Sequence, residues 1–218
     1  TDTFGSGYSS GGDTDWDVAA RLSGAPIYED DGAKVLYLGA AYVHRFIGND
    51  TTVRFRQRPE AHLADRFVDT LGFAADGSDL FLGDLAIIHG PWTFLAEYNN
   101  ALVSGDHGQS DVDFWGAYAQ LRYFLTDEHQ VYELAEGKFG RIKPKANFNP
   151  AKGRWGAWEI AARYSYLDLD DAGSTAGSRG QLNDVTVGLN WYWTPHTRWM
   201  MNYIHAFGDR ADVGKNDT

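Results

Sequence analysis

The sequence predicts an all-β protein, an antiparallel transmembrane β-barrel of which about nine strands are present, that is, a partial barrel. Hydrophobic and polar residues alternate with period 2 along most of the 218 residues, without a convincing helical period. Many alternating stretches have ten or more residues, whereas soluble strands usually have about 5–6 and a tilted membrane-crossing strand needs about 9–11. Short and long connections also alternate along the chain, as they do in outer-membrane barrels.

The expected strands follow one another in a single β-barrel domain, residues 1–218. Each ends where the alternation meets Gly, Pro, Asn or Asp, residues that are typical of turns. The expected strands cover residues 15–22, 34–46, 51–58, 79–88, 91–103, 112–125, 154–168, 183–194 and 197–207.

The connections between these strands fall into two classes. Counting strands places the tight turns on one side of the membrane, which is the periplasmic side in barrels of this kind. The same count places the long segment 126–153 on that side. Tight turns are expected at 47–50, 89–92 and 194–197, and longer polar loops at 23–33, 59–78, 104–111 and 169–182.

The two faces of each expected strand differ in character. The apolar faces are Val185, Val187, Leu189, Trp191 and Trp193; Trp158, Ile160, Ala162, Tyr164 and Tyr166; and Trp115, Ala117, Ala119, Leu121 and Tyr123. The opposite faces carry Asp184, Thr186, Gly188 and Asn190; Glu159, Arg163 and Ser165; and Tyr118, Gln120 and Arg122. A soluble sandwich would alternate as well, but aromatic residues near the strand ends are typical of membrane-interface girdles.

Composition argues against several classes of function. The formal net charge of −11 argues against a nucleic-acid partner. The absence of cysteine excludes disulfides and thiolate metal sites. No HExxH, GxSxG or phosphate-cradling loop occurs, so no catalytic residue, metal or cofactor is expected. Asp168, Asp170 and Asp171 lack the closing Glu of a calcium loop and are interpreted as solvated surface residues.

Six stretches carry a family resemblance, in chain order over nearly the whole sequence. They are RFRQRPEAHLADRFVDT, HGPWTFLAEY, YAQLRYFLTDE, KFGRIKPK, GAWEIAARYSYLDL and GLNWYWTPHTRWMMNYIHA. Together they resemble the phosphate-selective porin O/P family. The resemblance implies a 16-stranded porin-type barrel in the bacterial outer membrane, usually a homotrimer, that passes anions such as phosphate or polyphosphate.

The resemblance extends only over the C-terminal part of that family. Several N-terminal strands and the closing C-terminal strand are absent from the 218 residues. An open sheet would leave unpaired backbone groups in lipid. We therefore expect the chain to be a fragment, or the ordered part of a longer chain.

The stretch VRFRQR places Arg54, Arg56 and Arg58 on one strand face, about 6.7 Å apart. If Val53 and Phe55 face lipid, the arginines must face the lumen, because a lipid-facing charge at mid-bilayer costs about 2–4 kcal/mol. Guanidinium groups offer paired donors to oxyanions, and a row of weak sites lets an ion leave again. The candidate anion pathway consists of Arg45, Arg54, Arg56, Arg58, Arg122 and Arg163.

An alternative interpretation gives these arginines a structural role. In it they pair with lumen carboxylates on neighbouring strands and hold the barrel wall together. The candidate partners are Asp15, Asp17, Asp84, Glu97, Glu159 and Asp184.

A second basic group lies in the long segment 126–153. It contains Lys138, Arg141, Lys143 and Lys145, followed by Lys152 and Arg154, with no acidic residue between Glu136 and Glu159. By resemblance, such segments can fold into the lumen, where a cationic loop would raise the local anion concentration. A solvated basic turn on the periplasmic side is the alternative.

The sequence therefore predicts a passive outer-membrane porin for small inorganic or organic anions of the phosphate kind, without enzymatic chemistry. The expected partners are these anions, outer-membrane lipid or lipopolysaccharide, and two further copies of the chain. A general or weakly cation-selective porin with a structural arginine–carboxylate wall remains an alternative. So does a structural envelope barrel without specific transport.

Overall fold

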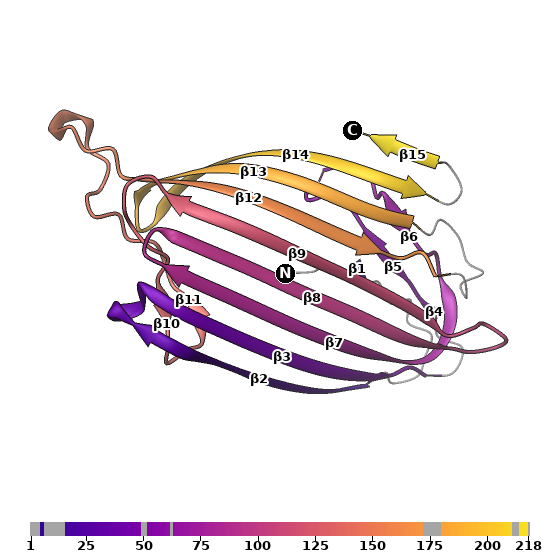
Figure 1. Ribbon diagram of the computed structural model, residues 1–218. Coiled ribbons are helices and arrows are strands. Elements are labelled where there is room, and N and C mark those ends of the chain that lie inside the picture. Colours follow the sequence, from indigo (N-terminus) through magenta and orange to yellow (C-terminus); the bar gives the residue numbers. More distant parts are fainter. Residues whose placement is uncertain are drawn as a thin grey trace.

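The computed structural model describes residues 5–6, 16–48, 52–61, 63–171, 180–210 and 214–217. Its main element is one curved antiparallel sheet in the order β15-β14-β13-β12-β9-β8-β7-β3-β2 (Figure 1). The strands are β2 (Trp16–Glu29), β3 (Lys34–Phe46), β7 (Phe73–His89), β8 (Trp92–Gly105), β9 (Val112–Phe124), β12 (Ala157–Asp168), β13 (Gly180–Thr194), β14 (Thr197–Arg210) and β15 (Gly214–Asp217). The prediction of an all-β antiparallel fold is confirmed, with β2 and β15 as the edges of the described sheet.

The smaller elements lie in the connections. They are β1 (Gly5–Ser6), β4 (Thr52–Val53), β5 (Phe55–Gln57), β6 (Val68–Asp69), β10 (Tyr132–Glu133) and β11 (Lys138–Phe139), with two 3-10 turns, η1 (Asp30–Gly32) and η2 (Pro150–Lys152). Among the described residues, no helix has the length and apolar character needed to cross a membrane.

The strands of the main sheet apart from β15 have the length that a barrel wall requires. They contain 12 to 17 residues each, more than the roughly 9–11 that a tilted strand needs to cross a bilayer. Their pairing is continuous, with an irregularity in β2 between Gly24 and Ile27. That irregularity explains one error: residues 23–33 were expected to form a long loop, but β2 continues through SGAP to Glu29.

The two ends of the sheet have different connections. The β2–β3, β7–β8 and β13–β14 turns and the segment 126–153 lie at one end, here called the turn end (left in Figure 1). The expected tight turn at 47–50 lies partly outside the described residues, but the strand pairing expected across it was wrong, because β3 pairs with β2 and β7. β3 stops at Phe46 and a long connection, residues 47–72, leads to β7 at the opposite end, called the loop end.

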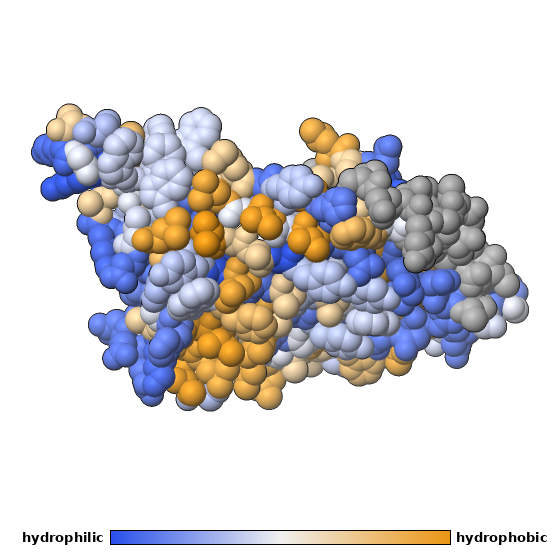
Figure 2. Space-filling view, turned by 45° about the horizontal axis from the view of Figure 1, so that its top comes forward, coloured by the Kyte–Doolittle hydropathy of each residue, from blue (hydrophilic) through white to orange (hydrophobic). Residues whose placement is uncertain are grey.

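The sheet has an apolar outer face and a polar inner face, as the alternation predicts. Trp199, Tyr203 and Val187 on the outer face are 58%, 69% and 53% exposed, an arrangement suited to contact with lipid. Glu159 and Thr93 on the inner face are completely buried. Hydrophobic side chains lie over the middle of the sheet and hydrophilic ones toward both ends (Figure 2).

Aromatic side chains form two bands on the outer face. At the turn end, Trp158 and Trp191 stack with their ring centroids 4.7 Å apart. At the loop end, Trp115 and Tyr166 lie 4.8 Å apart. Trp158 and Tyr166 are eight residues apart on β12, which is about 26 Å along the strand and about 20 Å along the membrane normal at a tilt near 40°. This separation fits the interfaces of a membrane whose apolar band is about 25 Å tall.

Residues 47–72 are called the inner segment, and those of them that the structure describes, 47–48, 52–61 and 63–72, fold over the inner face of the sheet at the loop end. Val53 and Phe55 are only 3% and 5% exposed, because they pack against Phe73, Phe114 and other inner-face residues. The prediction of a wall strand at 51–58 with these two residues facing lipid was therefore wrong. Alternation identifies a two-faced stretch, but it does not say whether the apolar face meets lipid or protein.

The segment 126–153, called the rim segment, packs on both faces of the wall at the turn end. Tyr132 joins a buried cluster with Val35 and Ile88 on the inner face. Ile142 packs in a second inner-face cluster with Phe124, Ala157 and Tyr192. The segment then reaches the outer face, where Phe148 stacks on Trp193 at 4.8 Å.

Candidate functional site

The inner segment presents its arginines on the face opposite its buried core. Along 53–56 the residues alternate between buried and half-buried, so the apolar side chains hold the segment on the sheet. The backbone is fixed by pairing of Arg56 with Asp69 and by a 2.9 Å hydrogen bond from the Phe55 N–H to Thr70 Oγ1. Local order in this segment therefore comes from its apolar residues and its short hairpin.

Arg54 forms a two-pronged contact with Asp69. Its Nε and Nη2 atoms donate to the two carboxylate oxygens at 2.7 and 2.5 Å. Partial burial alone would raise the pKa of the Asp69 carboxyl. The hydrogen bonds from Arg54 and from the Leu71 N–H outweigh burial and hold the pKa below its usual value.

Arg66 lies close to the three arginines of VRFRQR, a neighbour that sequence reasoning missed. Desolvation, together with repulsion from Arg56, Arg58 and Arg54, lowers the pKa of the Arg66 guanidinium. The four arginines are therefore near enough to interact electrostatically. We call Arg54, Arg56, Arg58 and Arg66 the arginine cluster, which Asp69 contacts through Arg54.

The candidate pathway arginines on the wall each contact a carboxylate. Arg45 donates to both oxygens of Asp17 at 2.8 Å, and Arg163 Nε lies 2.6 Å from Glu60 of the inner segment. Arg122 contacts Glu159. The structure thus separates these three wall residues from the arginine cluster.

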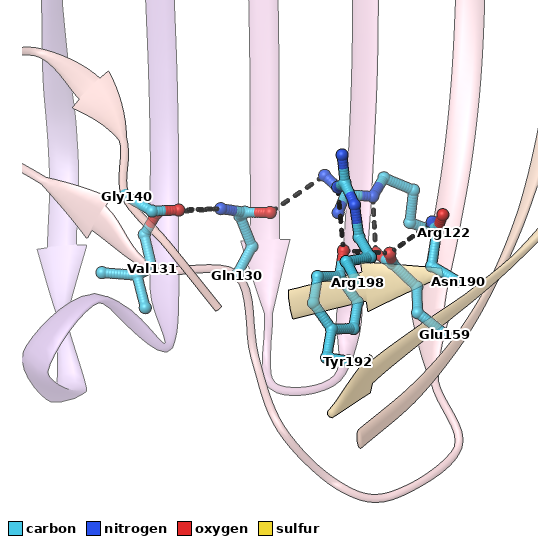
Figure 3. Close-up of polar contacts among 8 residues, drawn as sticks. All are labelled: Arg122, Gln130, Val131, Gly140, Glu159, Asn190, Tyr192 and Arg198. Carbon is cyan, nitrogen blue, oxygen red and sulfur yellow. Dashed lines mark hydrogen bonds and ion pairs between the residues drawn. The ribbon is translucent and has the colours of Figure 1, made fainter. Parts of the chain in front are cut away.

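Arg122 belongs to a buried polar network at the turn end (Figure 3). Its Nε donates to Glu159 at 2.6 Å and its Nη1 donates to Gln130 of the rim segment at 2.9 Å. Asn190 and the Tyr192 hydroxyl both donate to the other Glu159 oxygen at 2.8 Å. Every oxygen of the buried carboxylate is thereby bonded, the condition under which a buried charge is tolerated.

A further wall pair was absent from the sequence prediction. Arg21 on β2 reaches across β3 to Asp84 on β7, with an Nη2–Oδ1 distance of 2.8 Å. The crossing requires Gly39, because a Cβ there would lie 2.5 Å from the Asp84 carboxylate. A glycine opposite an aspartate in the register was the available signal.

Positive and negative side chains balance on the described inner face of β2 to β14. By strand register, and counting β14 only as far as Gly208, these are five arginines and five carboxylates: Arg21, Arg45, Arg122, Arg163 and Arg198, and Asp17, Asp84, Glu97, Glu159 and Asp184. Five of the six carboxylates expected as partners therefore lie on this face, and Asp15 lies outside the described residues.

Two of the five basic residues of the rim segment contact acids. Lys138 pairs with Glu136, which raises the pKa of its ammonium group, and Lys145 lies 3.1 Å from Asp127. Arg141 contacts His196 at 2.8 Å, and Lys143 is exposed. The rim segment contains five basic and four acidic residues, so it is only weakly positive.

No metal centre is apparent within the described ranges, where no three carboxylates or imidazoles are grouped as ligands would be. Asp168 accepts hydrogen bonds from Tyr166 and Gln181 at 2.9 and 3.0 Å. Asp171 accepts one from the Asp113 N–H at 2.8 Å. Asp168 and Asp171 therefore act as hydrogen-bond acceptors that stabilise the loop end.

The chain is similar to known porins along its length. A family model described as phosphate-selective porin O and P matches residues 2–218. Porin O of Pseudomonas aeruginosa is 27% identical over 221 residues, which cover 88% of this chain and 48% of that porin. An uncharacterised protein of Caulobacter vibrioides is 30% identical over 186 residues, covering 84% of this chain and 36% of that protein.

The chain spans about half or less of the length of these curated relatives. The long antiparallel strands, the two aromatic bands and the polar inner face agree with the family match. The chain belongs to the phosphate-selective porin O and P family, and its sheet is part of the wall of an outer-membrane β-barrel.

Proposed function

We propose that the whole protein is a passive channel for small anions of the phosphate class, and that the arginine cluster of the inner segment attracts them. The observation that supports this most is the gathering of four guanidinium groups on the inner segment, near enough to one another to interact electrostatically. No covalent step is involved, and flux follows the concentration gradient.

The charge balance of the wall determines how strongly the arginine cluster can attract anions. Arginines and carboxylates of the wall offset one another, and the inner segment carries its four arginines against Asp50, Glu60, Asp65 and Asp69, so positive charge is concentrated at the arginine cluster and is not in excess over the segment. A unit anion about 4 Å from one guanidinium gains about 1 kcal/mol in bulk water and about 4 kcal/mol at an effective dielectric constant of 20. Attraction of this size concentrates anions without holding them permanently.

The carboxylate contacts of the wall arginines favour a structural role for these residues. Arg45, Arg122 and Arg163 each contact a carboxylate at 2.6 to 2.8 Å. If they act only as wall supports and the cluster is inactive, the protein is a general or weakly cation-selective porin. A barrel that passes no ions would instead be a structural envelope protein.

Planar-bilayer recordings of the full-length protein test the proposal. Replacing Arg56, Arg58 and Arg66 with glutamine should lower the anion-over-cation permeability ratio, measured from reversal potentials across a chloride gradient and then a phosphate gradient. Arg154→Gln, at an exposed position directly after the rim segment, is the matched control and should leave the ratio unchanged. Equal reversal potentials for the triple variant and the wild type would refute the role of the cluster.

We also propose that the protein assembles as a homotrimer that contacts outer-membrane lipid, as the family resemblance implies. The exposed outer-face aromatics supply the apolar surface that such contacts need. Native mass spectrometry in detergent measures the oligomer directly, and a monomer at all detergent concentrations would contradict the trimer.

A further inference from the structure

The tip of the inner segment reaches across the inner face and contacts two wall strands through one side chain. Glu60 Oε1 lies 2.6 Å from Arg163 Nε and 3.2 Å from the Ser165 hydroxyl, both on β12. Its other oxygen accepts a 2.7 Å hydrogen bond from the Thr186 hydroxyl on β13. A single carboxylate therefore joins the segment to the wall at three points.

The contact continues into the wall. The Arg163 guanidinium lies over the ring of Tyr118 on β9, 3.7 Å from its centroid, a geometry that adds a cation–π attraction. The Tyr118 hydroxyl in turn donates to Glu97 on β8. The contact with Tyr118 restricts the position of the Arg163 guanidinium independently of Glu60. The wall therefore presents Glu60 with a well-ordered partner.

The surroundings of Glu60 are tight and mostly dry. Its backbone N–H hydrogen-bonds to the carboxylate of Asp184, which is 3% exposed. Hydrogen bonds to charged groups contribute more where water is excluded. Nearer the loop end the segment is held by apolar packing instead, for example Phe67 against Gly208.

These two attachments act on different parts of the segment. The apolar cluster fixes the stretch around Val53, Phe55 and Val68, whereas Glu60 lies two residues after Arg58 and six before Arg66. The position of the arginines over the wall therefore depends on the Glu60 contacts as well as on the apolar base.

We infer that Glu60 is a positioning residue, a latch that holds the tip of the inner segment on Arg163, Ser165 and Thr186 and so sets where the arginine cluster stands over the wall. The expected effect of Glu60 on the current rests on the proposed function. Its role in holding the tip of the inner segment rests only on the contacts described above. Glu60 touches no permeating ion in this role.

The test uses the full-length protein with Glu60→Gln, which keeps the shape of the side chain and removes its charge. The chain has no cysteine, so spin labels at Ala64→Cys on the segment and Ala41→Cys on the inner face of β3 report the position of the tip. Glu29→Gln is the matched control, because Glu29 pairs with Lys34 at the turn end. Heat-modifiable gel mobility confirms that each variant forms a folded barrel.

In Glu60→Gln we expect the distance distribution between the labels to broaden at least twofold and the open-channel current noise to rise several-fold. Glu29→Gln should match the wild type in both. Arg163→Gln should reproduce the effect, and the double variant should add little to either single change, since both remove the same contact.

The possible outcomes separate the latch from the proposed function. An unchanged distance distribution in Glu60→Gln overturns the latch and leaves the anion channel untouched. A broadened distribution with unchanged current and noise supports the latch, but refutes the proposal that the arginine cluster stands in the ion path. Additive effects of Glu60→Gln and Arg163→Gln would also overturn the latch, because the two residues would then act independently.

Discussion

Replacing Glu159 with leucine should destabilise the barrel wall more than any exposed charge change. The carboxylate is completely buried and bonds to Arg122, Asn190 and Tyr192. Removing one partner of a buried ion pair typically costs about 3–5 kcal/mol, because the other charge stays buried without compensation. The equilibrium constant for folding of Glu159→Leu should therefore be several hundred-fold lower than that of the wild type, since 1.4 kcal/mol corresponds to a factor of ten.

The double variant Glu159→Leu/Arg122→Leu identifies the physical cause. With both charges gone, the remaining cost comes from the donors of Asn190 and Tyr192, at about 1 kcal/mol each. The double variant should thus be more stable than the single one. The control is Glu29→Gln, whose exposed pair with Lys34 is worth about 0–1 kcal/mol.

The assay is denaturant unfolding of the full-length barrel in detergent micelles. Tryptophan fluorescence and gel mobility together report the folded fraction, and linear extrapolation gives the free energy of unfolding. A loss below about 1 kcal/mol for Glu159→Leu would refute the reasoning. A double variant as unstable as the sum of its singles would also refute it, because the cost would then not come from the unpaired charge.

Three further expectations concern the inner segment and the wall. Asp69→Asn should raise the anion-over-cation permeability ratio at neutral pH, because it removes the carboxylate that contacts the arginine cluster; a ratio equal to that of Glu29→Gln would contradict this. The pKa of Asp69 is lowered from 3.8 by Arg54, so their contact stabilises the segment above pH 3.8 and is lost as the pH falls through the lower folded value. Chloride selectivity should rise in that acidic range in the wild type and remain flat in Asp69→Asn. Gly39→Ala should lower the free energy of unfolding by about 1–3 kcal/mol, since a Cβ at 2.5 Å displaces Asp84; an unchanged midpoint in denaturant would show that the pair can shift without cost.

The wall could be predicted from the sequence because its pattern has one physical cause. Lipid outside and polar surroundings inside impose the period-2 alternation, and the assigned faces of β9, β12 and β13 are all observed. The same reasoning gave a wrong prediction for the inner segment, because Val53 and Phe55 alternate with polar residues in the same way but are buried against the sheet. Alternation cannot distinguish an apolar surface of lipid from one made of Phe73 and Phe114.

Some contacts within the site can be predicted from the order of the strands, and others cannot. Asp17 and Arg45 face each other in a hairpin register, and Arg122 and Glu159 lie on adjacent strands. Such pairs follow once strand order is known, which is why Asp17 and Glu159 were candidate partners. The Glu60–Arg163 contact joins a loop tip to a distant strand, so it depends on the path of the inner segment and leaves no local signal in the sequence.

The location of charge reconciles the acidic chain with the proposed anion channel. The wall is balanced and the rim segment is nearly so. At the loop end, residues 106–111 and 169–171 carry Asp106, Asp111, Asp170 and Asp171 and no lysine or arginine. At about 0.15 M salt the Debye length is about 8 Å, so carboxylates further than this from the arginine cluster act on it only weakly. The net charge of −11 therefore describes the mouths and loops, whereas the proposed selectivity depends on the few guanidinium groups that the inner segment holds over the wall.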